Sequence, residues 1–327
     1  MTRPVLVLLV ALVLAVPLSL LAGRVWIDPF HPVVANAAVI LAELRLPRAV
    51  LALAVGGGLG AAGAAMQGYL RNPLADPGLF GIAPTAALGA TLSFLVGGAA
   101  GWLLPVFALT GAGLGMALLA LISAGAGAGG GDPGRGIALF TLSGMMLASL
   151  SSALMALALS LAPTPFALTE IVTWQMGAIA DRSWRDVWIC APPTVIGVIL
   201  LASSGRDLDA LTLGETAARS LGVDPRHLQW RMIASVGLTV GAGVAVAGVI
   251  GFVGLMVPHL VRPFTDRRPS SLIWPSALGG ALLLLVADCL CRVLPLAGGE
   301  LRLGVALALL GTPFFLLLLL RMRGGAA

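Results

Sequence analysis

The sequence has very little charge. Only 10% of its 327 residues are Asp, Glu, Lys or Arg, while 59% are hydrophobic and the mean hydropathy is +1.03. Since a soluble domain carries about 25% charged residues, the composition excludes a soluble protein and indicates an integral membrane protein. The chain has no lysine, so its net charge of +5 is carried by arginine alone. In a membrane protein such an excess bears first on topology, and no nucleic-acid partner is expected.

Residues for covalent or metal chemistry are also scarce. The three cysteines are scattered, and none of the three histidines has a second histidine or cysteine at metal-ligand spacing. Without lysine there is no Walker-type nucleotide site. The glycines of 58–63 match a dinucleotide fingerprint formally, but they lie in a charge-free run and are better explained by close helix packing. The chain is therefore expected to bind no metal or cofactor itself and not to be an enzyme.

Long uncharged runs divide the chain into membrane spans. A span needs about 20 apolar residues. Single spans are predicted in 4–23, 49–70, 136–169, 187–205, 269–287 and 303–320, and two spans in 77–131 with a turn near 97–101. The run 232–261 is ambiguous: it fits one long tilted span or two short ones broken around 248–251.

The positive-inside rule distinguishes these two readings. Ten spans place 12 of the 19 arginines in the cytoplasm, whereas nine spans place only 9 there. Ten spans are therefore preferred, with both termini and the polar stretch 206–231 in the cytoplasm. The only acid expected inside a span is Asp288, and its expected partner is Arg292, one helical turn later.

The stretch 206–231 is the longest polar interruption, with eight charged residues in 26 positions. Thr212 and Glu215 fit a capping box at the start of a short helix. Gly222 is placed to end that helix, and Asp224 with Pro225 suits the start of the next one. The helix is expected to carry an apolar face and an i,i+4 ion pair: Leu213, Ala217, Ala218 and Leu221 for the face, Glu215 and Arg219 for the pair. Such a helix either lies on the lipid surface or docks onto another protein.

Arginines also lie on the predicted outer side, against the positive-inside trend. Arg45 and Arg48 are three residues apart and share a helical face, and Arg292 ends a later span. They are interpreted either as interfacial side chains whose charged heads reach the headgroups or as fixed cations that meet carboxylates on a partner. The segment 71–82, RNPLADPGLFGI, is interpreted as a tight loop because its prolines stop helices.

Three stretches resemble a known family: 44–82 (LRLPRAVLALAVGGGLGAAGAAMQGYLRNPLADPGLFGI), 211–223 (LTLGETAARSLGV), and 251–262 with 287–293 (GFVGLMVPHLVR and ADCLCRV). The chain resembles the FecCD-type permeases of ABC importers for iron-siderophores, haem and cobalamin over essentially its whole length. The resemblance implies an all-α protein with ten transmembrane helices, the type II ABC importer permease fold. It also implies a homodimer in the bacterial inner membrane, two cytoplasmic ATPase subunits that use ATP and Mg²⁺, and a periplasmic binding protein.

The resemblance also implies roles for particular residues. The coupling loop that contacts the ATPase falls on 206–231, with Thr212, Leu213, Glu215, Ala217, Ala218, Arg219, Leu221 and Gly222. Docking of the binding protein falls on Arg45, Arg48 and Arg292. The inner gate falls on Asp132, Pro133, Gly134 and Arg135, and the path-lining helix on Ser143, Gly144, Ala148, Ser151, Ser152 and Met155.

The predicted function is thus a single permease domain, 1–327, that imports a bulky metal chelate by ATP-driven alternating access. An ion-coupled secondary transporter is the alternative, and it would need acids at membrane depth. An intramembrane enzyme is disfavoured by the missing catalytic pairs. The sequence does not choose among the three cargoes, and it leaves open which face of the coupling helix meets the ATPase.

Overall fold

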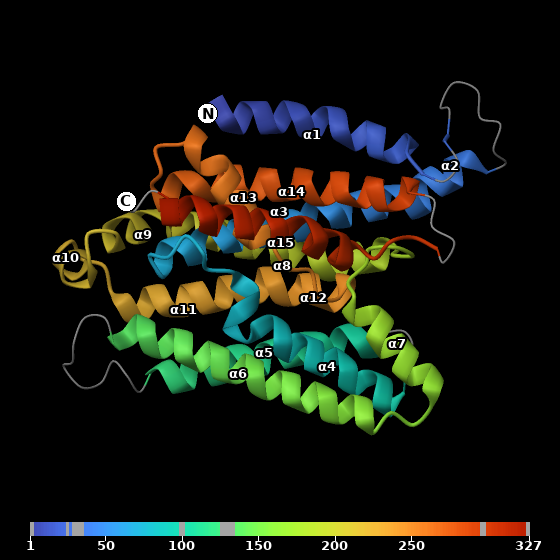
Figure 1. The fold of residues 1–327 in the computed structure, drawn as a ribbon, viewed down its shortest axis with the longest axis horizontal. Helices are drawn as coiled ribbons and strands as arrows, with labels where there is room; N and C mark the ends of the chain where they lie inside the picture. The colour runs from blue at the N-terminus through green and yellow to red at the C-terminus, as the bar shows by residue number, and fades with distance from the viewer. Residues whose placement is uncertain are drawn as a thin grey trace.

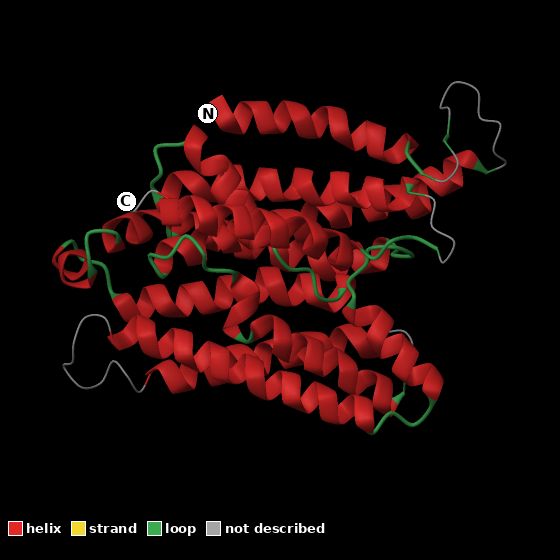
Figure 2. Cartoon of the chain, in the orientation of Figure 1, coloured by secondary structure: helices red, strands yellow, loops and turns green. Residues whose placement is uncertain are grey.

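The computed structural model describes residues 3–23, 26–27, 36–97, 102–124, 135–294 and 299–324, and within these ranges every regular element is a helix (Figure 2). The first half contains α1 (Arg3–Leu21), α2 (Ala37–Val39), η1 (Ile40–Arg45), α3 (Leu46–Tyr69), η2 (Pro77–Phe80), α4 (Ile82–Val96), α5 (Leu103–Ala124) and α6 (Arg135–Ser160). The second half contains α7 (Pro165–Gln175), α8 (Trp184–Ser203), α9 (Gly205–Leu211), α10 (Glu215–Ser220), α11 (Pro225–Val236), η4 (Gly237–Gly241), α12 (Ala242–Ala247), α13 (Val253–Val261), η5 (Arg262–Phe264), α14 (Pro269–Val293) and α15 (Leu303–Gly324).

The long helices run side by side between two ends of the bundle (Figure 1). One end carries α9, α10 and both chain termini, and we call it the α10 end. The opposite end carries α2 and α7, and we call it the α2 end. Having both termini at one end fits an even number of crossings, as the ten-span prediction requires.

Eight of the described helical segments are long and apolar enough to cross a membrane. The apolar α4, of 15 residues, and α13, of nine, complete a set close to the predicted ten. The break predicted in 232–261 is confirmed, because α12 ends at Ala247 and α13 begins at Val253. The predicted lengths are wrong, however: the first helix runs unbroken over Pro225–Ala247 and thus begins inside the polar stretch.

The helix α3 lies at the centre of the bundle and packs on its neighbours through glycines. A Cβ atom added at Gly60 would lie 2.0 Å from the Ser276 carbonyl oxygen of α14, and one at Gly63 would lie 2.0 Å from the Gly254 carbonyl oxygen of α13. Helices in lipid associate through such close backbone contact, because lipid provides no hydrophobic force between them. The packing role predicted for these glycines is confirmed.

Candidate functional sites at the two ends of the bundle

The polar stretch forms three consecutive helices at the α10 end: α9, α10 and the start of α11. Two glycines bracket α10, Gly214 with φ +100° and Gly222 with φ +88°, values that side chains other than glycine rarely adopt. The amide of Val223 then donates to the Ala218 carbonyl, as expected when a left-handed glycine ends a helix. The predicted start of α11 is also confirmed, since the Asp224 side chain accepts a hydrogen bond from the Arg226 amide.

The predicted capping box is wrong. Thr212 is the C-cap of α9, and its hydroxyl donates back to the Asp209 carbonyl at 2.6 Å. The N-cap of α10 is Gly214, which has no side chain to offer. The capping box does not form because the residues before Thr212 form the helix α9. The Thr212 hydroxyl binds a carbonyl at the end of α9 and is not available to cap α10.

The predicted single apolar face is wrong as well. Ala218 is fully buried, whereas Leu213 and Leu221 are 68% and 64% exposed. The predicted ion pair is confirmed, with 3.1 Å between Arg219 Nη2 and Glu215 Oε1. The Glu215 side chain turns towards the bundle and is 11% exposed, while that of Arg219 is 62% exposed. The outward surface of this segment therefore presents two leucines and an arginine among small polar residues such as Thr216 and Ser220. Two exposed leucines this close together are typical of a protein contact.

A cavity of about 350 Å³ lies beneath α10. Its lining combines Glu215 and Ala218 of α10 with Tyr69, Ser123 and Ile137 from the ends of α3, α5 and α6. The short helix thus faces the ends of three long helices across this cavity.

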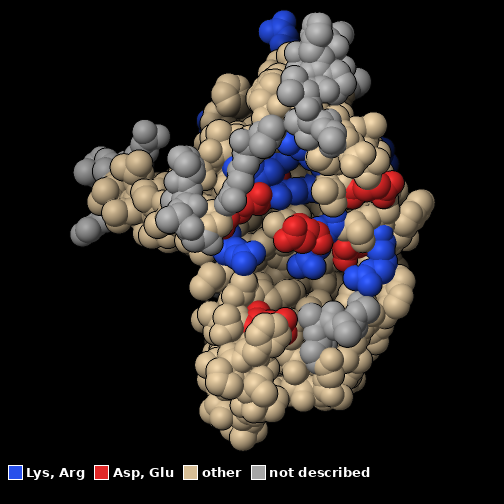
Figure 3. Space-filling model, turned by 90° about the vertical axis from the view of Figure 1, so that its right-hand side faces the viewer, with Lys and Arg blue, Asp and Glu red and all other residues tan. Residues whose placement is uncertain are grey.

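At the α2 end, charged side chains gather at the centre of the exposed face (Figure 3). Arg48 Nη2 lies 2.8 Å from Asp288 and also 2.8 Å from Glu300, and Arg292 Nη2 lies 3.0 Å from Asp288. The predicted partnership of Asp288 and Arg292 is confirmed. The second cation was missed, although an acid buried to 1% exposure needs more than one donor to satisfy its oxygens.

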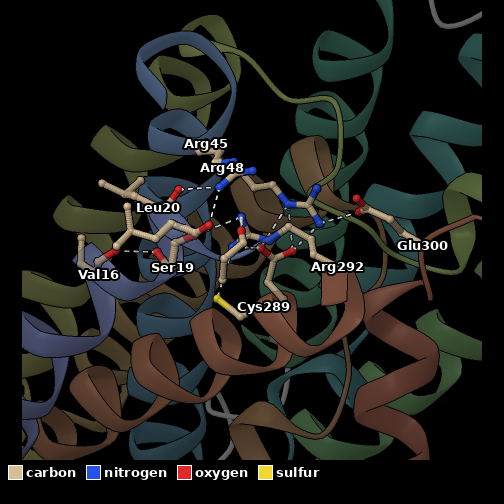
Figure 4. A network of polar contacts seen from close by, with 11 residues as sticks. Val16, Ser19, Leu20, Arg45, Arg48, Cys289, Arg292 and Glu300 are labelled. Atoms are coloured by element: carbon tan, nitrogen blue, oxygen red, sulfur yellow. Dashed lines mark hydrogen bonds and ion pairs between the residues drawn. The ribbon is translucent and has the colours of Figure 1, made fainter. Parts of the chain in front are cut away.

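Arginines also hold the end of α1 (Figure 4). Arg45 Nη1 donates to the carbonyl oxygens of Leu20 and Leu21, each at 2.8 Å. Arg292 Nη1 donates to those of Ser19 and Ala22 at 3.2 and 3.3 Å. The last carbonyls of a helix lack internal partners, and cations stabilise that end. The three arginines therefore tie α1, α3 and α14 together.

These contacts bear on the two interpretations of the outer arginines. The side chains of Arg48 and Arg292 are only 12% and 5% exposed, so they do not extend to a lipid headgroup, and that interpretation is wrong for both. Docking of a binding protein stays a prediction. It would use the pocket of about 340 Å³ at this end, which Arg45, Arg48, Arg182 and Arg292 line together with Asp181 and Glu300.

The predicted gate mostly lies outside the described residues. Asp132, Pro133 and Gly134 precede the described part of α6, and Arg135 is described only as the first residue of that helix. The gate therefore stays a prediction.

The predicted path residues of α6 point in two directions. Ser143, Gly144 and Ser151 are buried, with the Ser151 hydroxyl donating to the Leu147 carbonyl, and Ala148 is half-buried. Ser152 and Met155 line a cavity of about 540 Å³. As path residues, Ser152 and Met155 are thus the better placed of the six.

That cavity adjoins the break between α12 and α13. Residues 248–252 line it without helical structure, which membrane proteins tolerate at such depth where the backbone faces a cavity. Among the described lining residues only Asp76, Ser152 and Gln175 have polar side chains. The Asp76 carboxylate accepts hydrogen bonds from the amides of Gly78 and Leu255, so it caps the first turn of α13 from a distant loop. This capping role was not predicted, because the segment 71–82 by itself indicates only a tight loop.

A glycine-packed bundle with about ten crossings, a broken helix beside a cavity and an exposed polar segment at one end defines a polytopic membrane transport protein. The FecCD transport family matches residues 7–321. The chain belongs to this family.

Curated relatives cover nearly the whole chain. The vitamin B12 import system permease proteins BtuC of Salmonella typhi and Citrobacter koseri are 38% and 36% identical to it, over 94% and 96% of this chain and 92% and 93% of theirs. A solved structure of a candidate metal-chelate type ABC transporter in an inward-facing conformation matches with a TM-score of 0.87 and 31% identity, over 97% of this chain and 98% of that one. The PsaBC structure from Streptococcus pneumoniae, at 18% identity and a TM-score of 0.50, shares the fold.

These matches confirm the predicted fold and function. The chain is a permease subunit of an ABC importer with the type II fold, a multi-span protein that works with an ATPase and a substrate-binding protein. The alternative, an ion-coupled secondary transporter, is not favoured.

Proposed function

We propose that two copies of this chain form the import path for a bulky metal chelate across the bacterial inner membrane. Two cytoplasmic ATPase subunits, which bind ATP and Mg²⁺, would contact the α10 end, and a periplasmic binding protein would contact the α2 end. Both termini would then be cytoplasmic. This orientation is supported by the arginine distribution, since 12 of the 19 arginines fall on that side.

The observation that carries the coupling proposal is the exposure of Leu213 and Leu221 on either side of α10. A leucine that is more than 60% exposed outside the membrane favours binding of a partner that covers it. Full burial of such a side chain stabilises the complex by about 1.5–3 kcal/mol. A cleft on the ATPase would take these two side chains, while the buried face of α10, with Ala218, stays turned towards the bundle. ATP binding would move α10, and the chain itself would do no covalent chemistry.

Cobalamin is the first cargo to test, because relatives 36–38% identical over nearly the full length are vitamin B12 import permeases. Ferric siderophores and haem are the other members of the proposed class, consistent with the metal-chelate transporter that shares the fold. The mostly apolar cavity beside α6 and α15, with Ser152 and Gln175 among its few polar groups, suits a bulky chelate that must slide rather than bind tightly.

The test is reconstitution in vesicles with the cognate ATPase and binding protein. We expect uptake of labelled cobalamin that requires ATP on the side of the membrane where the ATPase subunits lie. Replacing ATP with a non-hydrolysable analogue should stop the uptake. Uptake of haem or a ferric siderophore in its place would reassign the cargo. Uptake that proceeds without any ATPase would refute the ABC importer mechanism.

A further inference from the structure

The helix α14 connects the two ends of the molecule. It begins beside α9 at the α10 end, and its last turns carry Asp288 and Arg292 at the α2 end (Figure 1). Along its length it contacts α3 at backbone distance, since a Cβ at Gly280 would lie 2.1 Å from the Gly56 carbonyl oxygen. A displacement at its start would therefore carry α3 and the charged cluster with it.

The start of α14 is held by a residue of α9. Asp209 Oδ1 accepts a hydrogen bond from the Ser270 amide at 2.9 Å, and Oδ2 accepts one from the Ser270 hydroxyl at 2.5 Å. The residue at the N-cap position of α14 itself, Arg268, makes no side-chain capping bond. The carboxylate of Asp209 thus satisfies an amide that the helix cannot pair internally, at the end where negative charge is favourable.

Close packing removes the space in which α9 could slide past this contact. A Cβ at Gly205 would lie 2.9 Å from that of Ser270, and one at Gly68 would lie 2.8 Å from that of Pro269. On the opposite side, Arg231 of α11 binds Asp207 at 3.1 Å and the Ser203 hydroxyl at 2.7 Å. The segment α9 is therefore fixed on two sides and joined directly to α10.

We propose that Asp209 is a positioning residue that transmits the displacement of α10 to α14, and through α14 to the α2 end. The inference rests on the proposed contact between the ATPase and α10. Packed helices joined by directed hydrogen bonds can carry such coupling. Within the described part of the chain, Asp209 is the residue of α9 whose side chain hydrogen-bonds to the start of α14, and the other contacts there are packing contacts.

The experiment compares transport stoichiometry in the reconstituted complex of full-length chains. In Asp209→Ala we expect the amount of cargo imported per ATP hydrolysed to fall about fivefold. Since a tenfold change corresponds to about 1.4 kcal/mol, this loss is equivalent to about 1 kcal/mol. Asp209→Asn keeps an acceptor oxygen for the Ser270 amide and should restore most of the ratio. Thermal unfolding and complex assembly, measured on the same samples, should stay close to those of the unmodified protein.

The matched control is Asp266→Ala. This carboxylate also lies at the start of α14, where it accepts hydrogen bonds from the Arg268 amide and the Ser271 hydroxyl, but it belongs to the loop before α14 and does not join α9. An equal loss in both variants, or no loss in Asp209→Ala, would overturn the inference. If Asp209→Ala does not assemble, Ser270→Ala takes its place, since it removes only the hydroxyl bond to Asp209. It should lower the ratio below that of Asp266→Ala, and a ratio equal to that control would overturn the inference.

The same measurements separate this inference from the proposed function. If the unmodified complex shows no ATP-dependent uptake, the proposed function fails. If the unmodified complex couples normally and Asp209→Ala does too, only the role of Asp209 fails.

Discussion

The two ends of the bundle use charge in opposite ways. At the α2 end, Arg48 and Arg292 both bind the buried Asp288, and Arg45 and Arg292 bind the end of α1. At the α10 end, charged side chains lie nearer the surface and fix helix ends, as Asp224 does for α11, while leucines are left exposed. One end is held together internally, and the other presents a surface.

The difference follows from where the residues lie in a membrane protein. A charge near membrane depth is costly unless it is paired, and at the α2 end Asp288 is accordingly paired with two arginines. Outside the membrane, backbone groups can use water and side chains, and exposed apolar residues become the distinctive feature. Structural roles are therefore expected to dominate substitutions at the α2 end, and functional roles those at the α10 end.

The largest expected effect is that of Asp288→Ala. Removing this carboxylate leaves two buried arginines without their shared partner, and breaking a buried pair costs about 3–5 kcal/mol. Since whole proteins are stable by only about 5–15 kcal/mol, we expect a large fall in the unfolding temperature in mild detergent. Glu300→Ala is the control, because Glu300 is 30% exposed and binds the same Arg48 from the surface. Equal shifts of the unfolding temperature in the two variants would show that a buried carboxylate at this end stabilises the fold no more than an exposed one.

A functional loss without a stability loss is expected at the opposite end. The double variant Leu213→Asp, Leu221→Asp changes two exposed side chains, so the unfolding temperature should stay within a few degrees. Coupled uptake should fall more than about tenfold, because two charges would be placed where apolar burial is proposed and each charge costs more than about 1.4 kcal/mol to bury. Ser220→Asp is the control for added charge on α10. Normal uptake in the double variant would show that the leucines do not contact the ATPase.

Local signals in the sequence predicted much of this architecture. The apolar spans, the break before α13, the small-residue packing face of α3 and the cap at Asp224 each follow from one continuous stretch of sequence. The apolar face of the coupling helix was mispredicted for an equally local reason. Leu213 precedes α10 and Leu221 is its C-cap, so helical spacing does not apply to either.

Contacts between distant segments could not be predicted. Asp209 caps α14 across 61 positions and Arg48 reaches Asp288 across 240. A capping pattern is visible in a sequence only when cap and helix are adjacent, because its geometry then follows from the backbone alone. Asp76 and Asp209 cap helices from other parts of the chain, and that arrangement exists only once the bundle has formed.

Arg45 tests whether the α2 end has a docking role beyond its structural one. Arg45→Gln keeps hydrogen-bond donors for the α1 carbonyls but removes a charge from the half-buried rim of the pocket. Affinity for the binding protein should fall by up to about fivefold at low salt, since an exposed ion pair contributes about 0.2–1 kcal/mol, and the difference should vanish at high salt. Arg185→Gln is the control, because Arg185 lies over the Trp102 ring and is outside the predicted docking set. Unchanged affinity at low salt would remove Arg45 from that set.

The smallest effect is expected for Arg219→Gln. Its pair with Glu215 is exposed on the arginine side, and i,i+4 pairs of this kind contribute about 0.3–0.5 kcal/mol. If the leucines make the contact with the ATPase, coupled uptake should change less than about twofold, because Arg219 then acts only on the helix to which it belongs. A loss comparable to that of the double leucine variant would instead assign the contact to the charged face of α10. Measuring both variants at equal amounts of assembled complex therefore decides which face meets the ATPase.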